Sequence, residues 1–238
     1  MSAAPGFVLF GAAHLWTLGS IAAIALLLPL AVRWLWPAAV RPLAVLLATL
    51  LLAQEAADIA MQGVRWGLTV QLLPLHLCSL AVFLTAWMLL TAQSRVYEVA
   101  YFWALGGTTQ ALLTPDLAFG FPDPAYLLFF VGHGLVIIGV LYATLAMGLR
   151  PWPMSVVRVA LITLAVAVVM FFINLWLGTN FLYLMAKPAR ASLLDWFGPW
   201  PWYWLGLIGV ALVSFLVLYL PFWLWDLWRR AEPRSRRD

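Results

Sequence analysis

Residues 159–173 read VALITLAVAVVMFFI and contain no charged side chain. They belong to an apolar run at about residues 156–182, which is long enough to cross a bilayer, because about 20 helical residues span its hydrocarbon core. Similar apolar runs lie at about residues 7–32, 42–62, 72–91, 96–113, 125–147 and 202–226. The sequence therefore predicts about seven transmembrane helices.

The composition of the whole chain supports this prediction. Of its 238 residues, 66% are hydrophobic and only 9% are charged, and the mean hydropathy is +0.99. These values exclude an ordinary soluble protein. The longest polar stretch is the C-terminal tail, Arg229–Asp238, which is too short to form a soluble domain. We predict an all-α, polytopic helical bundle that forms a single transmembrane domain over residues 1–238.

The thirteen Lys and Arg residues are unevenly distributed across the predicted membrane. One side carries Arg33, Arg41, Arg95, Arg150, Arg158, Arg229, Arg230, Arg234, Arg236 and Arg237, and the other carries Arg65, Lys187 and Arg190. Because cytoplasmic segments carry the excess of basic residues, we predict a multi-pass protein of the cell membrane with its N-terminus outside and its C-terminus in the cytoplasm. The net charge of +4 reflects this topology, and no nucleic-acid partner is expected.

Polar side chains inside the predicted helices are the candidates for function, because a bilayer disfavours such groups strongly. With the topology above, they lie in the outer half of the membrane, where we expect them to converge. These residues are His14, Gln54, Glu55, Asp58, His76, Cys78, Gln110, His133, Asn174 and Asn180.

Cys78 is the only cysteine, and it is a candidate nucleophile. Pro74 suits the first turn of a helix, which places Cys78 just beyond that turn, where the helix macrodipole favours a thiolate. His76 is two positions away, about 200° around a helix, so the base that activates Cys78 is expected on another helix. The alternative is that Cys78 is a small apolar core residue.

His133 is the predicted base, and Gly132 and Gly134 on either side of it allow another helix or a substrate chain to come close. A helix rises about 1.5 Å per residue, so Cys78 and His133 are expected roughly 9–14 Å below the starts of their helices. At that common depth the two side chains can meet as nucleophile and general base.

Carboxylates and amides supply the remaining candidates. Gln54 and Asp58 share a helix face, and Glu55 is three positions from Asp58. A carboxylate could orient His133 or His14 and stabilise its imidazolium, or these residues could instead form a structural polar clamp between helices. Side-chain amides that could donate to an oxyanion or a lipid headgroup, or simply join helices, belong to Gln110, Asn174 and Asn180.

Four motifs carry a resemblance to a known family. PLHLCSLAVF (74–83), GGTTQALLTP (106–115), GHGLVI (132–137) and NLWLGTNFLYLMAKP (174–188) resemble the YwaF-type bacterial integral membrane proteins, which are similar to the animal transmembrane protein 164 family. The likeness covers about residues 14–188. It implies a membrane acyltransferase that remodels ether phospholipids through a Cys and a His, at the positions of Cys78 and His133. Phe181 stands where a Tyr is expected after Asn180.

The resulting hypothesis is an intramembrane acyltransferase that remodels phospholipids through a Cys–His dyad and a thioester acyl-enzyme, with membrane phospholipids as substrates. Water as the acceptor would make it an acyl hydrolase. No metal and no soluble cofactor are expected, since the acyl donor is another lipid. Two alternatives remain open: a zinc-dependent lipid hydrolase that uses His14, His76, His133 and Asp58, and a transporter or binding protein for a lipid or small solute with Glu55 and Asp58 as proton sites.

Overall fold

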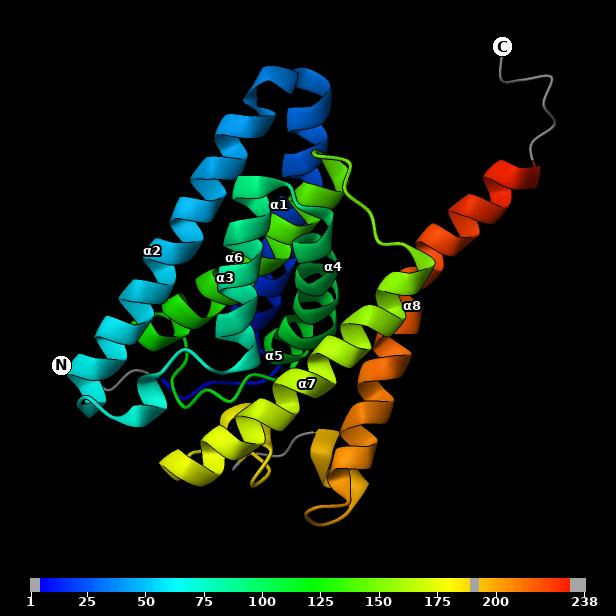
Figure 1. The fold of residues 1–238 in the computed structure, drawn as a ribbon. Coiled ribbons are helices and arrows are strands. Elements are labelled where there is room, and N and C mark those ends of the chain that lie inside the picture. The colour runs from blue at the N-terminus through cyan, green and yellow to red at the C-terminus, as the bar shows by residue number, and fades with distance from the viewer. Residues whose placement is uncertain (1–4, 189–192, 232–238) are drawn as a thin grey trace.

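A computed structural model describes residues 5–188 and 193–231, and Figure 1 shows its fold. Within these residues the chain forms helices and a single isolated β-bridge, between Gly6 and Phe119. The predicted all-α class is confirmed. The basic residues Arg190, Arg234, Arg236 and Arg237, which entered the topology prediction, lie outside the described residues.

The α-helices of the described part are α1 (Ala12–Leu35), α2 (Val40–Trp66), α3 (Leu77–Thr91), α4 (Ser94–Trp103), α5 (Thr109–Leu113), α6 (Pro124–Leu145), α7 (Pro153–Leu177) and α8 (Tyr203–Ala231). Six helical segments in these residues are long and apolar enough to cross a membrane; they are Ala12–Leu35, Pro37–Trp66, Val70–Thr91, Pro124–Leu145, Pro153–Leu177 and Tyr203–Arg230. The chain is therefore a multi-pass membrane protein.

The span predicted at residues 96–113 is a composite helix. α4, the π-helical segment η3 (Ala104–Thr108) and α5 contain 10, 5 and 5 residues and follow one another directly. This composite segment, which contains Arg95, Glu98 and Gln110, is not among the six that are long and apolar enough to cross a membrane.

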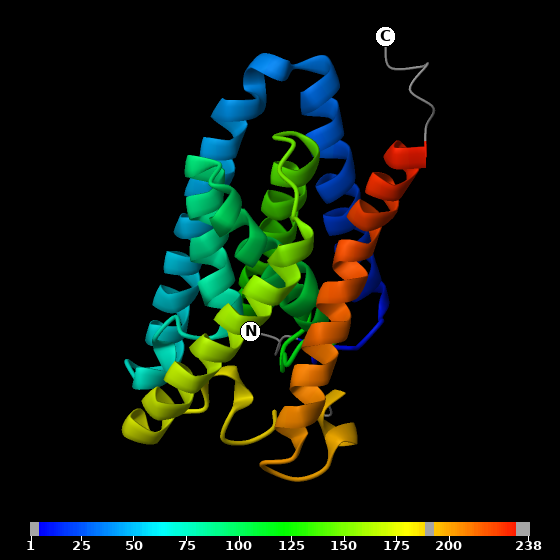
Figure 2. The ribbon, with the colours of Figure 1, turned by 45° about the vertical axis from the view of Figure 1, so that its right-hand side comes forward.

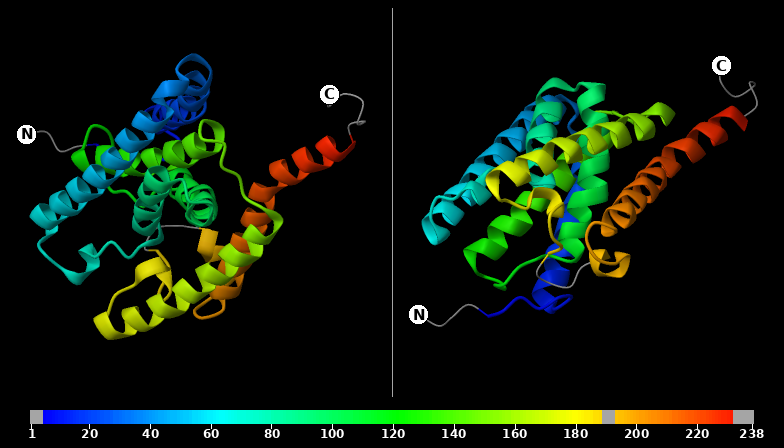
Figure 3. Two further views of the ribbon diagram at one scale, coloured as in Figure 1. Left: turned by 45° about the horizontal axis from the view of Figure 1, so that its top comes forward. Right: turned by 60° about the horizontal axis from the view of Figure 1, so that its bottom comes forward.

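α6 lies at the centre of the bundle and packs against α1, α2 and α3. Small residues at the helix contacts allow this close packing; a Cβ added to Gly139 of α6, for example, would come within 2.8 Å of Thr85 Cγ2 of α3. α7 and α8 pack on each other and reach the bundle through α4 and η3. Figures 2 and 3 show α8 at the edge of the molecule.

The helices begin and end later or earlier than predicted at several points. α3 begins at Leu77 and not near residue 72, because the chain forms a 3₁₀ turn at Val70–Leu72 and then an extended segment. Leu73 has φ −59° and ψ 131°, as expected for a residue before proline, which is sterically disfavoured from helical geometry. Pro74 therefore precedes α3 and does not occupy its first turn, so the predicted depth of Cys78 below the helix start is wrong.

α1 begins later than predicted and α7 ends earlier than predicted. α1 begins at Ala12 because the chain before it first pairs with another segment, with Phe7 N–H donating to the Ala118 carbonyl at 3.2 Å, and then turns, with Gly11 N–H donating to the Val8 carbonyl at 3.0 Å. The apolar run that begins near residue 7 predicts His14 about two turns into its helix, whereas His14 lies in the first turn of α1. α7 ends at Leu177, where Gly178 takes the left-handed conformation with φ 65°, a common helix stop.

The end of the bundle where α1, α3 and α6 begin and α2, α5 and α7 end is called the cavity end below. At the opposite end, arginines bind the last carbonyls of helices, where the macrodipole is negative. Arg33 Nη1 donates to the Leu145 carbonyl of α6 at 2.7 Å, and Arg41 Nη1 donates to the Leu89 carbonyl of α3 at 2.8 Å.

Candidate functional site

A cavity of about 350 Å³ lies at the cavity end, between α2, α3, α6, η3 and the segment that precedes α6. Cys78 and His133 both line it. The other polar side chains in its wall are Gln54, Glu55, Asp58, Gln62, Arg65, Ser79, Thr108 and Asp116. The structure thus brings one thiol, one imidazole and several carboxylates to a common space.

Cys78 is the second residue of α3 and is a free cysteine. His76, the N-cap, has extended backbone geometry and makes no side-chain capping hydrogen bond. The first backbone N–H groups of a helix have no partner within it and carry the positive end of the macrodipole. Cys78 therefore lies in the first turn, closer to that positive end than the sequence predicted.

His133 lies between two and three turns into α6, as predicted. One of its ring nitrogens, Nδ1, is 2.8 Å from the Phe129 carbonyl oxygen. A carbonyl can only accept, so Nδ1 carries the proton, and Nε2 of the neutral ring is left as the acceptor. The Phe129 ring stacks on the imidazole with centroids 4.0 Å apart, which further fixes the ring orientation.

Within the part of the chain that the structure describes, no hydrogen bond joins the Cys78 thiol to the His133 ring. The two groups face the shared cavity from different helices. This arrangement leaves room for a water or a substrate carbonyl between them, and catalytic hydrogen bonds often tighten only when substrate is bound.

The glycines on either side of His133 admit neighbouring helices. A Cβ added to Gly134 would come within 3.0 Å of the Ile21 side chain of α1, and one added to Gly132 would collide with the Gln54 amide of α2. Gln54 Nε2 donates to the Leu128 carbonyl at 2.8 Å, and Gln54 Oε1 is buried without a hydrogen-bond partner. Gln54 therefore joins α2 to the helix that carries His133.

The carboxylates of α2 do not orient a histidine. The partner of His133 Nδ1 is the Phe129 carbonyl. Asp58 Oδ2 accepts a hydrogen bond from Gln62 Nε2 at 2.8 Å, and Glu55, which is only 8% exposed, faces the cavity beside it. The backbone carbonyl one helical turn away reaches the histidine without spanning the cavity, which explains why it replaces the predicted carboxylate.

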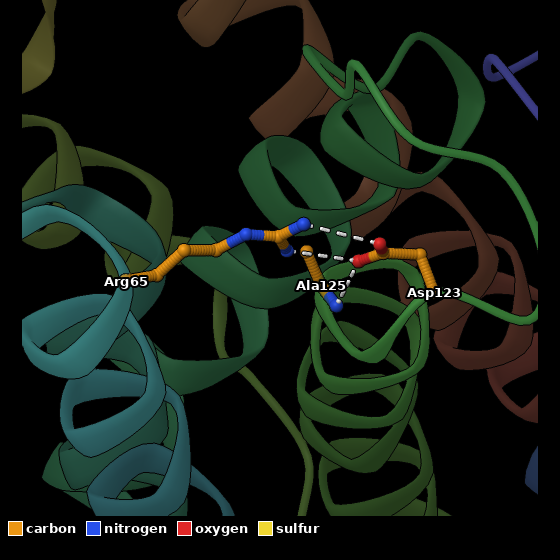
Figure 4. Close-up of polar contacts among 3 residues, drawn as sticks. All are labelled: Arg65, Asp123 and Ala125. Carbon is orange, nitrogen blue, oxygen red and sulfur yellow. Dashed lines mark hydrogen bonds and ion pairs between the residues drawn. The ribbon is translucent and has the colours of Figure 1, made fainter. Parts of the chain in front are cut away.

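An ion pair lies at the rim of the cavity (Figure 4). Arg65 of α2 donates from Nη1 and Nη2 to the two carboxylate oxygens of Asp123 at 3.0 and 3.2 Å. Asp123 is also the N-cap of α6, because its Oδ1 accepts from Ala125 N–H at 2.8 Å. The Arg65 guanidinium holds the pKa of Asp123 below its ordinary value. The pair ties the end of α2 to the start of α6.

His14 lies at the cavity end but outside the cavity wall. Its Nδ1 accepts from Phe10 N–H at 3.0 Å, so its Nε2 carries the proton that is donated to the Leu112 carbonyl at 2.9 Å. Both ring nitrogens are bound to backbone, and this histidine joins α1 to α5.

Four other predicted site residues also lie outside the cavity wall. His76 packs against the rings of Phe181 and Tyr183, and Gln110 is exposed. Asn174 and Asn180 each bind nearby backbone, the former to Phe181 and the latter to Met185 and Ala186. The amides therefore stabilise the local turn after α7, and the expected convergence holds for α2, α3 and α6 only.

Several residues of the wall were missing from the predicted site: Gln62, Arg65, Ser79, Thr108 and Asp116. Helical periodicity could have indicated two of them, because Gln62 and Arg65 continue the face of α2 that carries Asp58. Asp116 follows α5 in a loop, and no local pattern places it beside the others.

The described residues contain no group of three or more His, Cys, Asp and Glu side chains able to hold a metal ion. The zinc hypothesis required three histidines at one point. His14 and His76 lie outside the wall in which His133 lies, so the structure does not assemble that ligand set.

Comparison with known proteins identifies a family. The TMEM164 family matches residues 9–219, most of the chain. Searches of curated proteins and of solved structures each gave no match. The match includes α1 to α7, most of α8 and every residue of the cavity wall. The chain therefore belongs to the TMEM164 family.

Proposed function

We propose that this protein is an intramembrane acyltransferase that remodels phospholipids through an acyl thioester on Cys78. One observation carries the proposal: Cys78, in the first turn of α3, and His133, with Nε2 left as an acceptor, line the same cavity. A thiol and a base that share a cavity are the minimal parts of a nucleophilic acyl-transfer site.

In the first half-reaction, His133 Nε2 takes the thiol proton and Cys78 Sγ attacks the ester carbonyl of a phospholipid. A carbon–sulfur bond forms, and the carbonyl oxygen becomes an oxyanion. When the tetrahedral intermediate collapses, the carbon–oxygen ester bond breaks and His133 returns the proton to the leaving oxygen. The products are a lysolipid and the Cys78 acyl thioester.

In the second half-reaction, the hydroxyl of a different lysolipid attacks the thioester while His133 Nε2 accepts its proton. The carbon–sulfur bond breaks, and the thiolate recovers the proton from His133. Water in place of the lysolipid would give a free fatty acid. No soluble cofactor enters either half-reaction, because a lipid ester supplies the acyl group.

The size and place of the cavity suit a lipid ester. Its volume of about 350 Å³ is at the lower end of small-molecule pockets, enough for a glycerol ester linkage while the acyl chains stay in the membrane. Glu55 and Asp58 in its wall would orient polar headgroup atoms. The resemblance of the PLHLCSLAVF and GHGLVI segments to those of membrane acyltransferases supports the same reaction.

The proposal is tested with purified protein in liposomes that contain a phospholipid with a labelled acyl chain and an unlabelled lysophospholipid. We expect label transfer by the wild type and a loss of at least ~100-fold in Cys78→Ala, Cys78→Ser and His133→Ala. The Cys78→Ala/His133→Ala double variant should lose little more, because residues that act as one unit are not additive. Ser214→Ala, on α8 outside the cavity, serves as the control. Full transfer by Cys78→Ala would refute the proposal.

The orientation in the membrane is part of the proposal. Ten basic residues on one side of the membrane against three on the other support an outer N-terminus and a cytoplasmic C-terminus, which places the cavity end in the outer leaflet. A C-terminal tag should react with a membrane-impermeant reagent only after the cells are opened. Labelling of the tag in intact cells would reverse the assignment.

A further inference from the structure

The helix that passes beside Cys78 has an irregular turn at one point. In the π-helical segment η3, Ala104–Thr108, Thr109 N–H donates to the Ala104 carbonyl, five residues back instead of four. Such π-bulges are rare and occur frequently at functional sites. The bulge ends at Thr108, and Thr108 lines the cavity.

Thr108 differs from most of the helical threonines in the described residues. Those whose hydroxyl donates to the carbonyl four residues earlier are Thr17, Thr49, Thr91, Thr114, Thr144 and Thr163. The Ala104 carbonyl, four residues before Thr108, accepts the π-type bond instead. Thr108 is 1% exposed, and its Oγ1 has no hydrogen-bond partner beyond its contact with the Cys78 thiol. A thiol is a weak hydrogen-bond partner, and a buried hydroxyl without a strong one is unfavourable, so its position at the cavity suits a ligand.

A glycine brings this hydroxyl close to the nucleophile. A Cβ added to Gly107 would come within 2.9 Å of Leu77 Cδ2, so any larger residue here would require the Leu77 side chain to move where η3 packs on the first turn of α3. Leu77 and Gly107 each directly precede a residue of the wall, Cys78 and Thr108. The thiol of Cys78 and the hydroxyl of Thr108 are consequently neighbours in the cavity.

The backbone of α3 offers a second donor at the same place. The first hydrogen bond of the helix runs from Leu80 N–H to the His76 carbonyl at 3.0 Å, and no side chain caps the turn. The N–H groups that precede Leu80, including that of Cys78, have no acceptor within the helix. Donors fixed at a helix N-terminus stabilise negative charge that develops beside them.

We propose that the Thr108 hydroxyl and the Cys78 backbone N–H form the oxyanion hole of this site. The inference rests on the proposed acyl transfer. When Cys78 Sγ adds to the ester carbonyl, the π-electron pair moves onto the carbonyl oxygen, and Thr108 Oγ1–H and Cys78 N–H donate to that oxygen. When this electron pair re-forms the carbonyl double bond, the ester carbon–oxygen bond breaks and the leaving oxygen takes the proton from His133. Thr108 keeps its own proton throughout.

The test compares Thr108→Val, which removes only the hydroxyl, with Thr108→Ser, which keeps it. Thr85→Val is the matched control, because Thr85 is also buried with an unpartnered Oγ1 but lies outside the cavity wall. Three quantities are measured in detergent for each variant: the rate of acyl-thioester formation from a phospholipid, the rate of Cys78 alkylation by iodoacetamide, and the melting temperature.

We expect Thr108→Val to form the thioester ~100- to 1,000-fold more slowly than the wild type, the usual effect of losing one oxyanion donor. Alkylation forms no oxyanion and should fall much less than thioester formation, because only the weak contact between this hydroxyl and the thiol is lost. The melting temperature should change little, because a hydroxyl without a strong partner contributes little hydrogen-bond energy. Thr108→Ser should stay within ~10-fold of the wild-type rate of thioester formation, and Thr85→Val should match the wild type in all three measurements.

Three results would contradict the oxyanion hole, and each would have a different meaning. Wild-type thioester formation in Thr108→Val would overturn the oxyanion hole and leave the Cys78–His133 reaction intact. Parallel losses of alkylation or of melting temperature would show that Thr108 acts on the thiol or on packing, and would also overturn it. If the wild type itself forms no acyl thioester, the proposed function fails and the oxyanion hole fails with it.

Discussion

The Gln54 side chain of α2 lies directly against Gly132 of α6, the residue that precedes His133. A Cβ at Gly132 would fall 2.5 Å from both Gln54 Nε2 and Gln54 Oε1. The same amide donates to the Leu128 carbonyl, one turn before Gly132. Glycine at this position therefore sets how closely α2 approaches the helix that carries the proposed base.

Gly132→Ala should destabilise the protein by about 1–3 kcal/mol, the usual effect of overpacking in a tight interior. Adding Gln54→Ala should recover part of this loss, because it removes the atoms with which the new methyl group collides. Unfolding in detergent measures both effects. Gly19→Ala in α1, where a Cβ would meet nothing within 4 Å, is the control. A Gly132→Ala variant as stable as Gly19→Ala would contradict the contact.

The Arg65–Asp123 pair predicts a pH dependence of stability. Arg65 lowers the pKa of Asp123 in the folded protein, while the unfolded value is near 3.9, the approximate ordinary value for Asp. A lowered pKa adds stability that is fully present above the unfolded pKa and is lost as the pH falls through the folded pKa. The melting temperature should therefore drop below about pH 4.

Asp123→Asn isolates this charge, because asparagine caps a helix about as well as aspartate. We expect the variant to have a lower melting temperature than the wild type at pH 7 and a smaller further loss below pH 4. Thermal melts at a series of pH values in one detergent provide the comparison. Parallel pH profiles for the two proteins would show that the pair does not contribute.

A buried carboxylate at the opposite end predicts an unequal response to two arginine substitutions. Glu98 is 2% exposed and pairs with Arg158 of α7, while Arg95, which is 69% exposed, lies 3.5 Å away. Arg158→Ala leaves Glu98 without its closest partner and should cost on the order of 3–5 kcal/mol. Arg95→Ala should cost less than about 1 kcal/mol, as for exposed pairs.

Denaturant unfolding of both arginine variants, and of Glu98→Gln combined with Arg158→Ala, measures these differences. The combined variant should be more stable than Arg158→Ala alone, because it no longer buries an unpaired charge. Equal losses for the two arginine variants would indicate that Arg158 does not hold α7 to α4 through Glu98.

Much of the fold follows from apolar run length, which predicted the membrane helices, and from helical periodicity, which placed Gln54, Glu55 and Asp58 on one wall. The depth of His133 in α6 was predictable because Pro124 starts that helix close to the expected residue. The start of α3 was not, since a 3₁₀ turn and an extended segment precede it. Apolar run length does not distinguish these from an α-helix.

The details of the site depend on contacts that a linear pattern does not contain. His133 binds the Phe129 carbonyl, and in the π-helical segment Thr109 N–H binds the Ala104 carbonyl. In both cases tertiary packing determines which backbone carbonyl accepts the hydrogen bond. Asn174 and Asn180 were expected at the site because buried amides are costly. Both side chains instead form hydrogen bonds with the backbone of the turn after α7. Such local hydrogen bonds compete with any longer-range role.

Mass spectrometry of the protein after brief exposure to a phospholipid shows whether Cys78 carries the acyl group. We expect a mass increase equal to one acyl chain on the peptide that contains Cys78. This adduct should be removed by neutral hydroxylamine, which cleaves thioesters, and should be absent in Cys78→Ala. Lipid remodelling by a wild-type protein that never carries such an adduct, or that carries it on another residue, would contradict the claim.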